Sequence, residues 1–387
     1  MKSKDKINLG LFPVLNRFYK YKNRSSPKYN FTLKIKNSLI CLDKPFPLNQ
    51  LIPKHNWLTI FEPEDHLKNL SLTIKKFKKF NSKSIIGSFS IKDKPLINFF
   101  KNITKNIYTL NPNKDFNKIN KLASFESFDK YFINNISFIR NKYKMCDLLI
   151  VRHVLEHSTN IKVFLSSLKK MIRKDGLLLL EVPDCEKQFN CGDITVLWEE
   201  HNFYFTESSL RFFLQSQGFE IIKFVRYKYP MEDSLAVLLK ITNDDSDVKP
   251  VLFKNTLLVT FQKNLFDQQK LFRNFLTKYN KKIIFYGAGH TTFAFIYILK
   301  IQSYVKCIID DNPNKINKYS PFDSIKIISS SSLNHIEHKQ ICILGVNPSS
   351  HSNIINNNKK FLFKGGSFFS IFPNQSNYIL NNLNDIH

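Results

Sequence analysis

The chain has few cysteines, and its six thiols include no Cys-x-x-Cys pair. This spacing excludes a zinc knuckle and supports no disulfide framework. No uninterrupted apolar run is long enough to span a membrane, and no apolar segment follows the basic start as it would in a signal peptide. We therefore expect a reduced, cytoplasmic protein with no membrane partner.

Acidic residues are also scarce, since 31 Asp and Glu face 58 Lys and Arg, giving a formal net charge of +27. Such a charge suggests a nucleic acid or another anionic partner. The lysines, however, are scattered among Asn, Ile and Phe from end to end, without a basic stripe or an arginine-rich motif. We therefore favour a bias in residue usage over solvated faces and predict no nucleic-acid partner, while an anionic small molecule stays an alternative.

Apolar runs alternate with helical patterns in two parts of the chain, which predicts an α/β protein of two or three domains. The first 75 residues are rich in turns and proline and indicate a small irregular module. Residues 243–249 are polar and acidic, as in a linker. The expected strands are Ser84–Gly87, Asn106–Leu110, Cys146–Val151, Leu177–Val182, Phe219–Phe224, Ser234–Ile241, Lys282–Tyr286, Val305–Ile309 and Gln340–Gly345.

The most informative segment begins with the apolar run Cys146–Val151. A helix-length segment and the turn signal Lys174-Asp175-Gly176 separate it from the next run, Leu177–Val182. Both runs are typical of strands buried on both faces, joined in a βαβ crossover. Ligands of such sheets bind at the carboxyl ends of the strands, where His153 and Glu156 fall.

The order of these segments, closed by Trp198–Thr206, resembles the second half of class I S-adenosylmethionine-dependent methyltransferases. The closing Glu-Glu-His-x-x-Tyr-Phe-Thr more specifically resembles the nucleotide-sugar C-methyltransferases, which act on nucleotide-linked keto-sugars. The resemblance extends to Ile283–His290, to Ile308–Lys315 and, at the amino terminus, to Asn16–Phe18. It implies a Rossmann-like methyltransferase sheet, S-adenosyl-L-methionine as the cofactor and a nucleotide-sugar as the substrate.

Three units follow from this resemblance. Residues 1–75 correspond to a zinc-binding-like module, residues 76–245 to the methyltransferase domain, and residues 246–387 to a substrate-binding carboxy-terminal α/β domain. In the first unit, Lys34 and Asn37 stand where relatives carry a second cysteine pair, and the first pair is also missing. Because a closed zinc site needs such thiolates, we predict no metal.

The cofactor turn departs from the family pattern of an acid followed by two glycines. Ile85–Asp93 offers one glycine and no preceding acid, and Asn111 replaces the acid that ends the second strand. Asn can still hydrogen-bond a ribose hydroxyl, although without charge assistance. The residues that we expect at the cofactor are Gly87, Ser88, Asn111, His153 and Glu156.

The resemblance places His201 at the sugar as general base, because C-methylation beside a keto group requires removal of a proton from carbon. Glu200 would orient the ring or share the proton transfer, and Tyr204 would either bind substrate or belong to the core. A surface-loop histidine is the alternative for His201. A metal pair of His153 and His157 lacks a third ligand at a suitable offset in the sequence.

In the carboxy-terminal unit, the residues expected to bind substrate are Tyr286, Gly287, Asn312 and Lys315. Gly287 and Gly289 with Asp310 also resemble a dinucleotide fingerprint without its third glycine, so a nicotinamide cofactor stays an alternative.

The leading hypothesis is therefore a carbon methyltransferase. Its alternatives are methylation of another small molecule, or a non-catalytic sugar-nucleotide-binding protein. The oligomeric state is left open.

Overall fold

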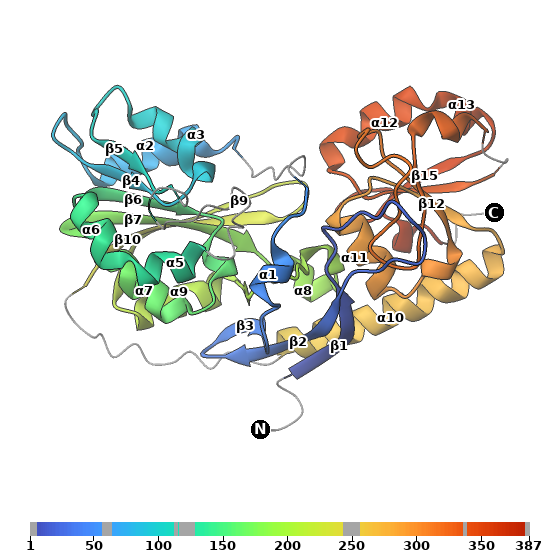
Figure 1. The fold of residues 1–387 in the computed structure, drawn as a ribbon, viewed down its shortest axis with the longest axis horizontal. Coiled ribbons are helices and arrows are strands. Elements are labelled where there is room, and N and C mark those ends of the chain that lie inside the picture. The colour runs from blue at the N-terminus through green and yellow to red at the C-terminus, as the bar shows by residue number, and fades with distance from the viewer. Residues whose placement is uncertain are drawn as a thin grey trace.

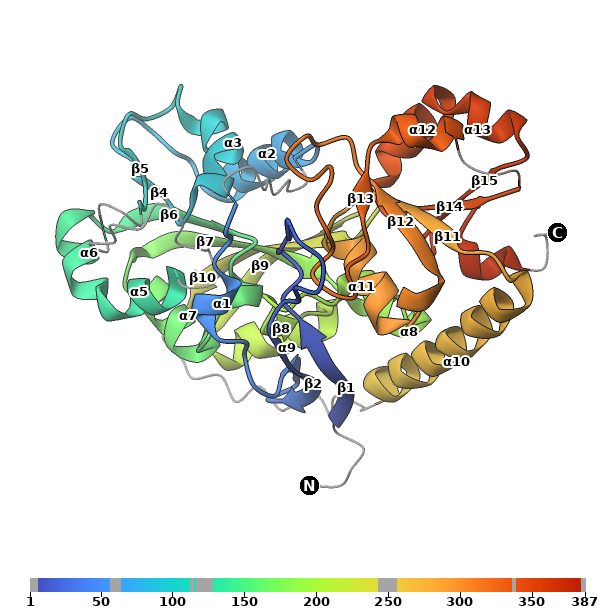
Figure 2. The same cartoon turned by 45° about the vertical axis from the view of Figure 1, so that its right-hand side comes forward.

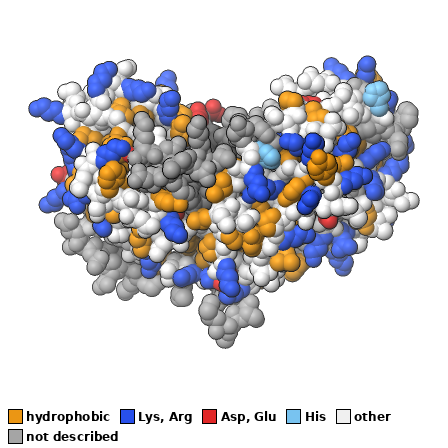
Figure 3. All heavy atoms as spheres, viewed as in Figure 1, with side chains coloured by type: hydrophobic (Ala, Val, Ile, Leu, Met, Phe, Trp, Pro, Cys, Tyr) orange, Lys and Arg blue, Asp and Glu red, His pale blue; other side chains and the backbone are white. Residues whose placement is uncertain are grey.

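The computed structural model describes residues 6–55, 64–111, 115, 128–242, 256–335 and 339–383. Two α/β lobes stand side by side, and the amino-terminal strands lie between and below them (Figures 1 and 2). Within these residues, no helix combines the length and the apolar character needed to cross a bilayer. Lys and Arg side chains are spread over both lobes on the face shown in Figure 3.

The first lobe contains a six-stranded sheet in the order β5-β4-β6-β7-β10-β9. All neighbours pair in parallel except β10, which runs antiparallel to both β7 and β9. This mixed sheet has the Rossmann-like arrangement that we expected from the sequence. The strands are β4 (Ile86–Ser88), β5 (Ile107–Thr109), β6 (Cys146–Arg152), β7 (Ile172–Asp184), β9 (Phe219–Tyr227) and β10 (Asp233–Ile241).

Helices cover both faces of this sheet (Figure 1), which explains why every residue of β6 is buried. On one face, α5 (Phe128–Asn134), α6 (Ile136–Lys142), α7 (Ile161–Lys169) and α9 (Glu207–Ser216) contribute to one apolar cluster. On the other face lie α2 (Leu67–Phe77) and α3 (Lys94–Ile97). Helix α2 crosses the predicted domain boundary at residue 75 and packs on the six-stranded sheet.

Strand β7 begins earlier than the sequence predicts. Its pairing with β6 moves from Cys146–Ile172 to Leu148–Leu177, so the intervening residues form an irregularity within the strand. Residues 173–175 are exposed there. The Lys-Asp-Gly signal, which we expected to be a turn before the strand, is therefore a bulge inside it.

The second lobe is a five-stranded parallel sheet in the order β13-β12-β11-β14-β15, which confirms the second α/β unit. Its strands are β11 (Ile283–Tyr286), β12 (Val305–Ile309), β13 (Ile327–Ile328), β14 (Ile341–Leu344) and β15 (Ser367–Ser370). Its helices are α10 (Thr256–Tyr279), α11 (His290–Ile298), α12 (His351–Asn357) and α13 (Lys359–Phe363). The strand order reverses between β11 and β14, where ligands of such sheets bind.

The amino-terminal module is a sheet, and our expectation of an irregular module is wrong. Antiparallel strands β1 (Lys6–Pro13), β2 (Lys28–Lys36) and β3 (Leu39–Leu42) pair in sequence, and β3 pairs with β8 (Phe203–Tyr204) of the first lobe. Helix α1 (Leu48–Leu51) follows the sheet, and α8 (Glu186–Cys191) precedes β8 in the first lobe. Strand β2 is rich in lysine and buries only Phe31 and Leu33, so its apolar signal is weak.

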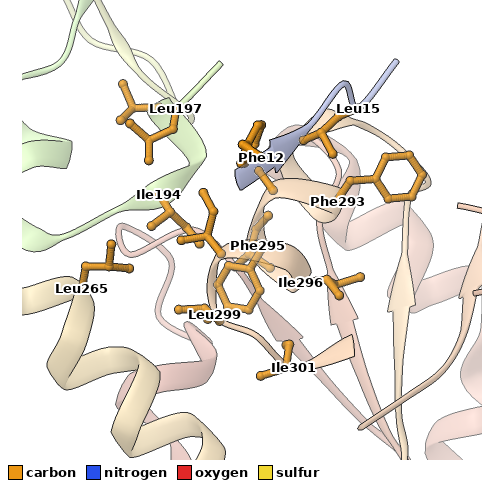
Figure 4. Close-up of a cluster of buried hydrophobic side chains, with 14 of the residues drawn as sticks. Phe12, Leu15, Ile194, Leu197, Leu265, Phe293, Phe295, Ile296, Leu299 and Ile301 are labelled. Carbon is orange, nitrogen blue, oxygen red and sulfur yellow. The ribbon is translucent and has the colours of Figure 1, made fainter. Parts of the chain in front are cut away.

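One hydrophobic core joins the three units. Phe12 of β1 lies near Phe293 and Phe295 of α11, and Ile194 and Leu197 approach the cluster from the first lobe (Figure 4). The segment that follows Leu197 is consequently held where all three units meet.

Candidate active site

The Trp198–Asn202 segment is fixed against the end of β6 by Asn202. The backbone N–H of Asn202 donates to the Glu156 carbonyl at 2.8 Å, and its side-chain amide donates to the carbonyls of His157 at 2.9 Å and Ser158 at 3.3 Å. These bonds bring His201 next to His157, with ring centroids 4.8 Å apart. Both histidines are buried.

His157 has a defined tautomer. Its Nδ1 lies 3.0 Å from the carbonyl oxygen of Glu200, and since a carbonyl can only accept, this nitrogen carries the proton. Burial and the neighbouring His201 lower the pKa of His157 well below its ordinary value. His157 is therefore a neutral imidazole whose Nε2, 3.8 Å from Oε1 of Glu156, holds a lone pair.

Glu199 connects the three units at this point. Its carboxylate accepts the backbone N–H of Leu15 at 2.7 Å and lies 2.7 Å from Nε2 of His290. His290 stacks on Trp198 with ring centroids 3.7 Å apart and planes 5° from parallel. The sequence predicted a role for neither Glu199 nor His290, because these partners are 184 and 91 residues apart along the chain.

The buried Glu199 contact makes a testable contribution to stability. Glu199→Gln keeps an acceptor for Leu15 but removes the carboxylate beside His290. We expect the free energy of unfolding to fall by about 1–3 kcal/mol, the usual effect of losing a buried charged hydrogen bond. Urea unfolding followed by circular dichroism measures this change, and an unaltered midpoint would contradict the role of Glu199 as the connector.

Glu200 directly precedes His201 in the sequence, and the Tyr204 ring lies 6.1 Å from the His201 ring. The Glu200 carboxylate is 3.4 Å from the side-chain amide of Asn16, in the amino-terminal module. The Tyr204 hydroxyl donates to the Trp198 carbonyl at 3.0 Å, and its ring is buried against Phe189. Tyr204 thus supports the Trp198–Asn202 segment, and its contact with substrate stays a prediction.

At the carboxyl end of β4, where we expect the cofactor, the ring of Tyr108 leaves no room for a side chain in place of Gly87. A Cβ added at Gly87 would lie 2.5 Å from the ring of Tyr108 on β5. The adjacent Ser88 hydroxyl donates to Oγ1 of Thr109 at 2.7 Å. Asn111 lies just after β5 and is exposed, while its backbone N–H donates to Asp115 at 2.5 Å.

The turn after β4 is closed by Asp93. Its fully buried carboxylate accepts the backbone N–H groups of Phe89 at 2.9 Å, Ser90 at 2.8 Å and Arg152 at 3.0 Å. Burial raises the pKa of Asp93 to about 7. The Phe89 ring lies 5.1 Å from that of Phe132, so a core side chain occupies part of this turn.

A buried ionic group lies at the ends of β6 and β7. Nε of Arg152 is 2.6 Å from Glu181, which also lies 3.0 Å from Nε2 of His66 and 3.3 Å from Nε2 of His153. Burial alone would raise the pKa of Glu181, but Arg152 and the histidines outweigh it and keep the pKa well below its ordinary value. His153 has a left-handed backbone, with φ of 50°, which costs about 1–2 kcal/mol.

The predicted substrate residues of the second lobe also lie together. Asp310 accepts from the backbone N–H of Ala288 at 2.8 Å, that of Asn312 at 2.9 Å and Nζ of Lys315 at 2.9 Å. It thereby joins the Gly287–Gly289 turn to the segment after β12. Gly287 has φ of 99°, and Tyr286 donates to Asp311 at 2.5 Å.

The amino-terminal module, which we expected to correspond to a zinc-binding-like module, contains a group of ion pairs. Nζ of Lys34 lies 2.6 Å from Asp43, which also pairs with Lys6 at 3.2 Å. Hydrogen bonds from these lysines lower the pKa of Asp43. Cys41 is a buried thiol whose pKa burial raises to about 11. The module is held by its sheet and the shared core.

Comparison with known protein families matches both lobes. The methyltransferase domain family matches residues 93–223, and the C-methyltransferase C-terminal domain family matches residues 247–373. By its domain content the chain is a methyltransferase. No curated protein shows a significant sequence match to this chain.

Similar solved structures are distant methyltransferases. The 1,6-didemethyltoxoflavin-N1-methyltransferase of Burkholderia thailandensis, solved with S-adenosylhomocysteine, is 10% identical over 54% of this chain and 98% of its own, with a TM-score of 0.36. The magnesium protoporphyrin IX methyltransferase of Synechocystis, solved with S-adenosylmethionine, is 11% identical over 46% and 79%, with a TM-score of 0.31. A methyltransferase of Aquifex aeolicus is 10% identical over 47% and 100%, with a TM-score of 0.28.

The structure of this methyltransferase therefore groups its predicted site residues in three places. Glu156, Glu200 and His201 meet at the junction of the units. Gly87 and Ser88 lie in β4, which pairs with β6, and Asn111 lies just after β5. Tyr286, Gly287, Asn312 and Lys315 lie in the second lobe, where the glycine turn leads into α11 and His290.

Proposed function

We propose that this methyltransferase uses S-adenosyl-L-methionine to methylate a carbon beside the keto group of a nucleotide-linked sugar, with His201 as general base. The observation that carries the proposal is the contact between Trp198 and His290. It brings the segment that contains His201 against the start of α11, directly after the predicted substrate turn. A sugar nucleotide held by the second lobe would thus reach the base in the first.

The surroundings of His201 suit proton abstraction. Its ring lies beside the neutral His157 and 5.9 Å from the Trp198 ring, in a setting that excludes water from much of the imidazole. A neutral His201 would take the proton from the sugar carbon, leaving an enolate. Glu200 would stabilise the imidazolium that forms. When bound, S-adenosylmethionine supplies the methyl group that the enolate carbon receives.

The end of β5 suits the ribose of S-adenosylmethionine, whereas the turn after β4 offers the cofactor few groups to bind. Asn111 is exposed at the end of β5 and can hydrogen-bond a ribose hydroxyl. The turn amides of Phe89 and Ser90, by contrast, already donate to Asp93. We infer that Asn111 holds the ribose and that the closed turn contributes little to affinity.

Removing the Asn111 amide tests this assignment. Asn111→Ala should weaken binding of S-adenosylmethionine about fivefold, the equivalent of one neutral hydrogen bond of about 1 kcal/mol. Titration calorimetry measures the dissociation constant, with Asn106→Ala, at the other end of β5, as the control. Equal affinity of Asn111→Ala and the wild type would place the ribose elsewhere.

A second function is favoured by the same closed turn. Because Asp93 satisfies amides that a cofactor would otherwise meet, the protein could bind a sugar nucleotide without transferring a methyl group. Incubation with S-adenosylmethionine and a panel of nucleotide-linked keto-sugars, followed by mass spectrometry, distinguishes the two. A mass gain of one methyl group supports the enzyme, and sugar-nucleotide binding without any gain supports the binding protein.

A further inference from the structure

Three side chains with metal-binding atoms converge at the junction of the units. Glu156, His157 and His201 each offer one ligand atom, and these atoms all lie within 4.8 Å of one another. All three residues are buried. Among the residues that the structure describes, this is the one group of three or more His, Cys, Asp or Glu with such geometry.

Hydrogen bonds hold the backbone of both segments that carry these side chains. Asn202 donates its N–H to the Glu156 carbonyl and its amide to the His157 carbonyl, at 2.8 and 2.9 Å. Strand β8 then pairs with β3 and anchors the chain after His201. The two segments that contribute ligands are thus held at a fixed separation before any ion arrives, which reduces the entropic cost of binding.

The orientation of His157 is that of a metal ligand. Its Nδ1–H donates to the Glu200 carbonyl, an arrangement that histidine ligands commonly make with their second nitrogen. The lone pair on Nε2 lies 3.8 Å from Oε1 of Glu156, beyond hydrogen-bonding distance. Two electron-pair donors on neighbouring side chains would both be stabilised by one shared cation.

We propose that Glu156, His157 and His201 bind one divalent transition-metal ion of the zinc type. Two imidazoles and one carboxylate suit such an ion, whereas magnesium and calcium prefer oxygen ligands alone. Donor atoms about 2.1 Å from one tetrahedral zinc lie roughly 3.4 Å apart, so the side chains, whose donor atoms lie within 4.8 Å of one another, need to close by at most about 1.4 Å. The fourth position is left for water or a substrate oxygen.

Metal binding also has a consequence for catalysis, which rests on the proposed function. A neutral imidazole has a single lone pair, and a metal bound to His201 uses it. The same ring cannot then accept a proton from the sugar. The metal-loaded protein is therefore inactive, and a chelator restores the activity.

The test is metal uptake by the full chain, without a histidine tag, cofactor or substrate. After dialysis against a chelator, zinc chloride is titrated by calorimetry, and cobalt chloride is titrated while visible absorption is recorded. The wild type should bind one ion per chain, and the cobalt form should show the intense visible bands of a tetrahedral site. Glu156→Gln, nearly isosteric, and His157→Ala should each weaken binding at least tenfold.

His335→Gln is the matched control, because it removes an exposed imidazole of the second lobe that does not belong to the metal group. It should bind zinc as the wild type does. A wild type that takes up no zinc, or His157→Ala and Glu156→Gln variants that bind it unchanged, would overturn the proposal. None of these readouts depends on methyl transfer, so the metal site and the proposed function can fail independently.

Discussion

His201→Ala should reduce the turnover number by about 10²–10⁴, the usual contribution of a general base. The loss follows from the position of His201, buried beside a neutral His157 at the point where the lobes meet. The dissociation constants for cofactor and sugar nucleotide should change much less, because a base acts mainly in the transition state. Steady-state kinetics together with calorimetry separate the two effects.

Glu200→Gln is the informative companion to this variant. The backbone carbonyl of Glu200, and not its carboxylate, accepts from His157, so the substitution preserves that hydrogen bond. It removes only the charge that would stabilise the imidazolium, and we expect a smaller loss than for His201→Ala. A His201→Ala enzyme with wild-type turnover would move the base to Tyr204 or Glu200.

Phe12→Ala should lower the free energy of unfolding by about 3–5 kcal/mol, as for other large aromatic deletions in a packed core. Phe12 is 2% exposed, and its ring lies 5.0 Å from that of Phe31 and 6.0 Å from that of Tyr297. Because this core is shared by the amino-terminal module and the second lobe, the deletion weakens both units and the contact between them.

The adjacent Leu11 is the natural control, since 56% of its surface is exposed. Leu11→Ala should change the free energy of unfolding by less than about 0.5 kcal/mol. Urea unfolding followed by circular dichroism compares the two variants. A Phe12→Ala protein as stable as Leu11→Ala would show that the shared core does not hold the units together.

Most strands of both lobes could be predicted from the sequence, because their apolar runs are buried on both faces. Cys146–Val151 and Lys282–Tyr286 are examples, and each appears as a strand within one residue of its predicted bounds. The amino-terminal sheet could not be predicted, since the lysines of β2 dilute its two buried residues. The start of β7 was missed because a bulge and a turn have the same residue signature, Lys-Asp-Gly.

The sequence could indicate single residues of the candidate site but not the contacts between them. The sequence indicated His201 and Glu200 through a family resemblance, and the roles of the predicted site residues stay predictions. It contained no signal for the pairing of Glu199 with His290, or for the approach of Glu156 and His157 to His201, because such contacts depend on tertiary packing. Our objection that His157 lacked a third ligand considered only neighbours in sequence.

The turn after β4 was likewise predictable only in part. The missing glycines were visible in the sequence, and they indicated that the cofactor would meet an altered turn. The reason that the turn is stable without them is three-dimensional. Asp93 reaches back to the amides of Phe89 and Ser90 and across to that of Arg152 on β6.

Hydrogen exchange at the sugar carbon tests the central claim most directly. The protein, freed of metal by a chelator, is incubated in deuterated water with a nucleotide-linked keto-sugar, and deuterium at the carbon beside the keto group is followed by NMR. We predict exchange with the wild type and none above the uncatalysed rate with His201→Ala. Exchange at the wild-type rate with His201→Ala, or no exchange with a wild type that binds the sugar nucleotide, would contradict the account.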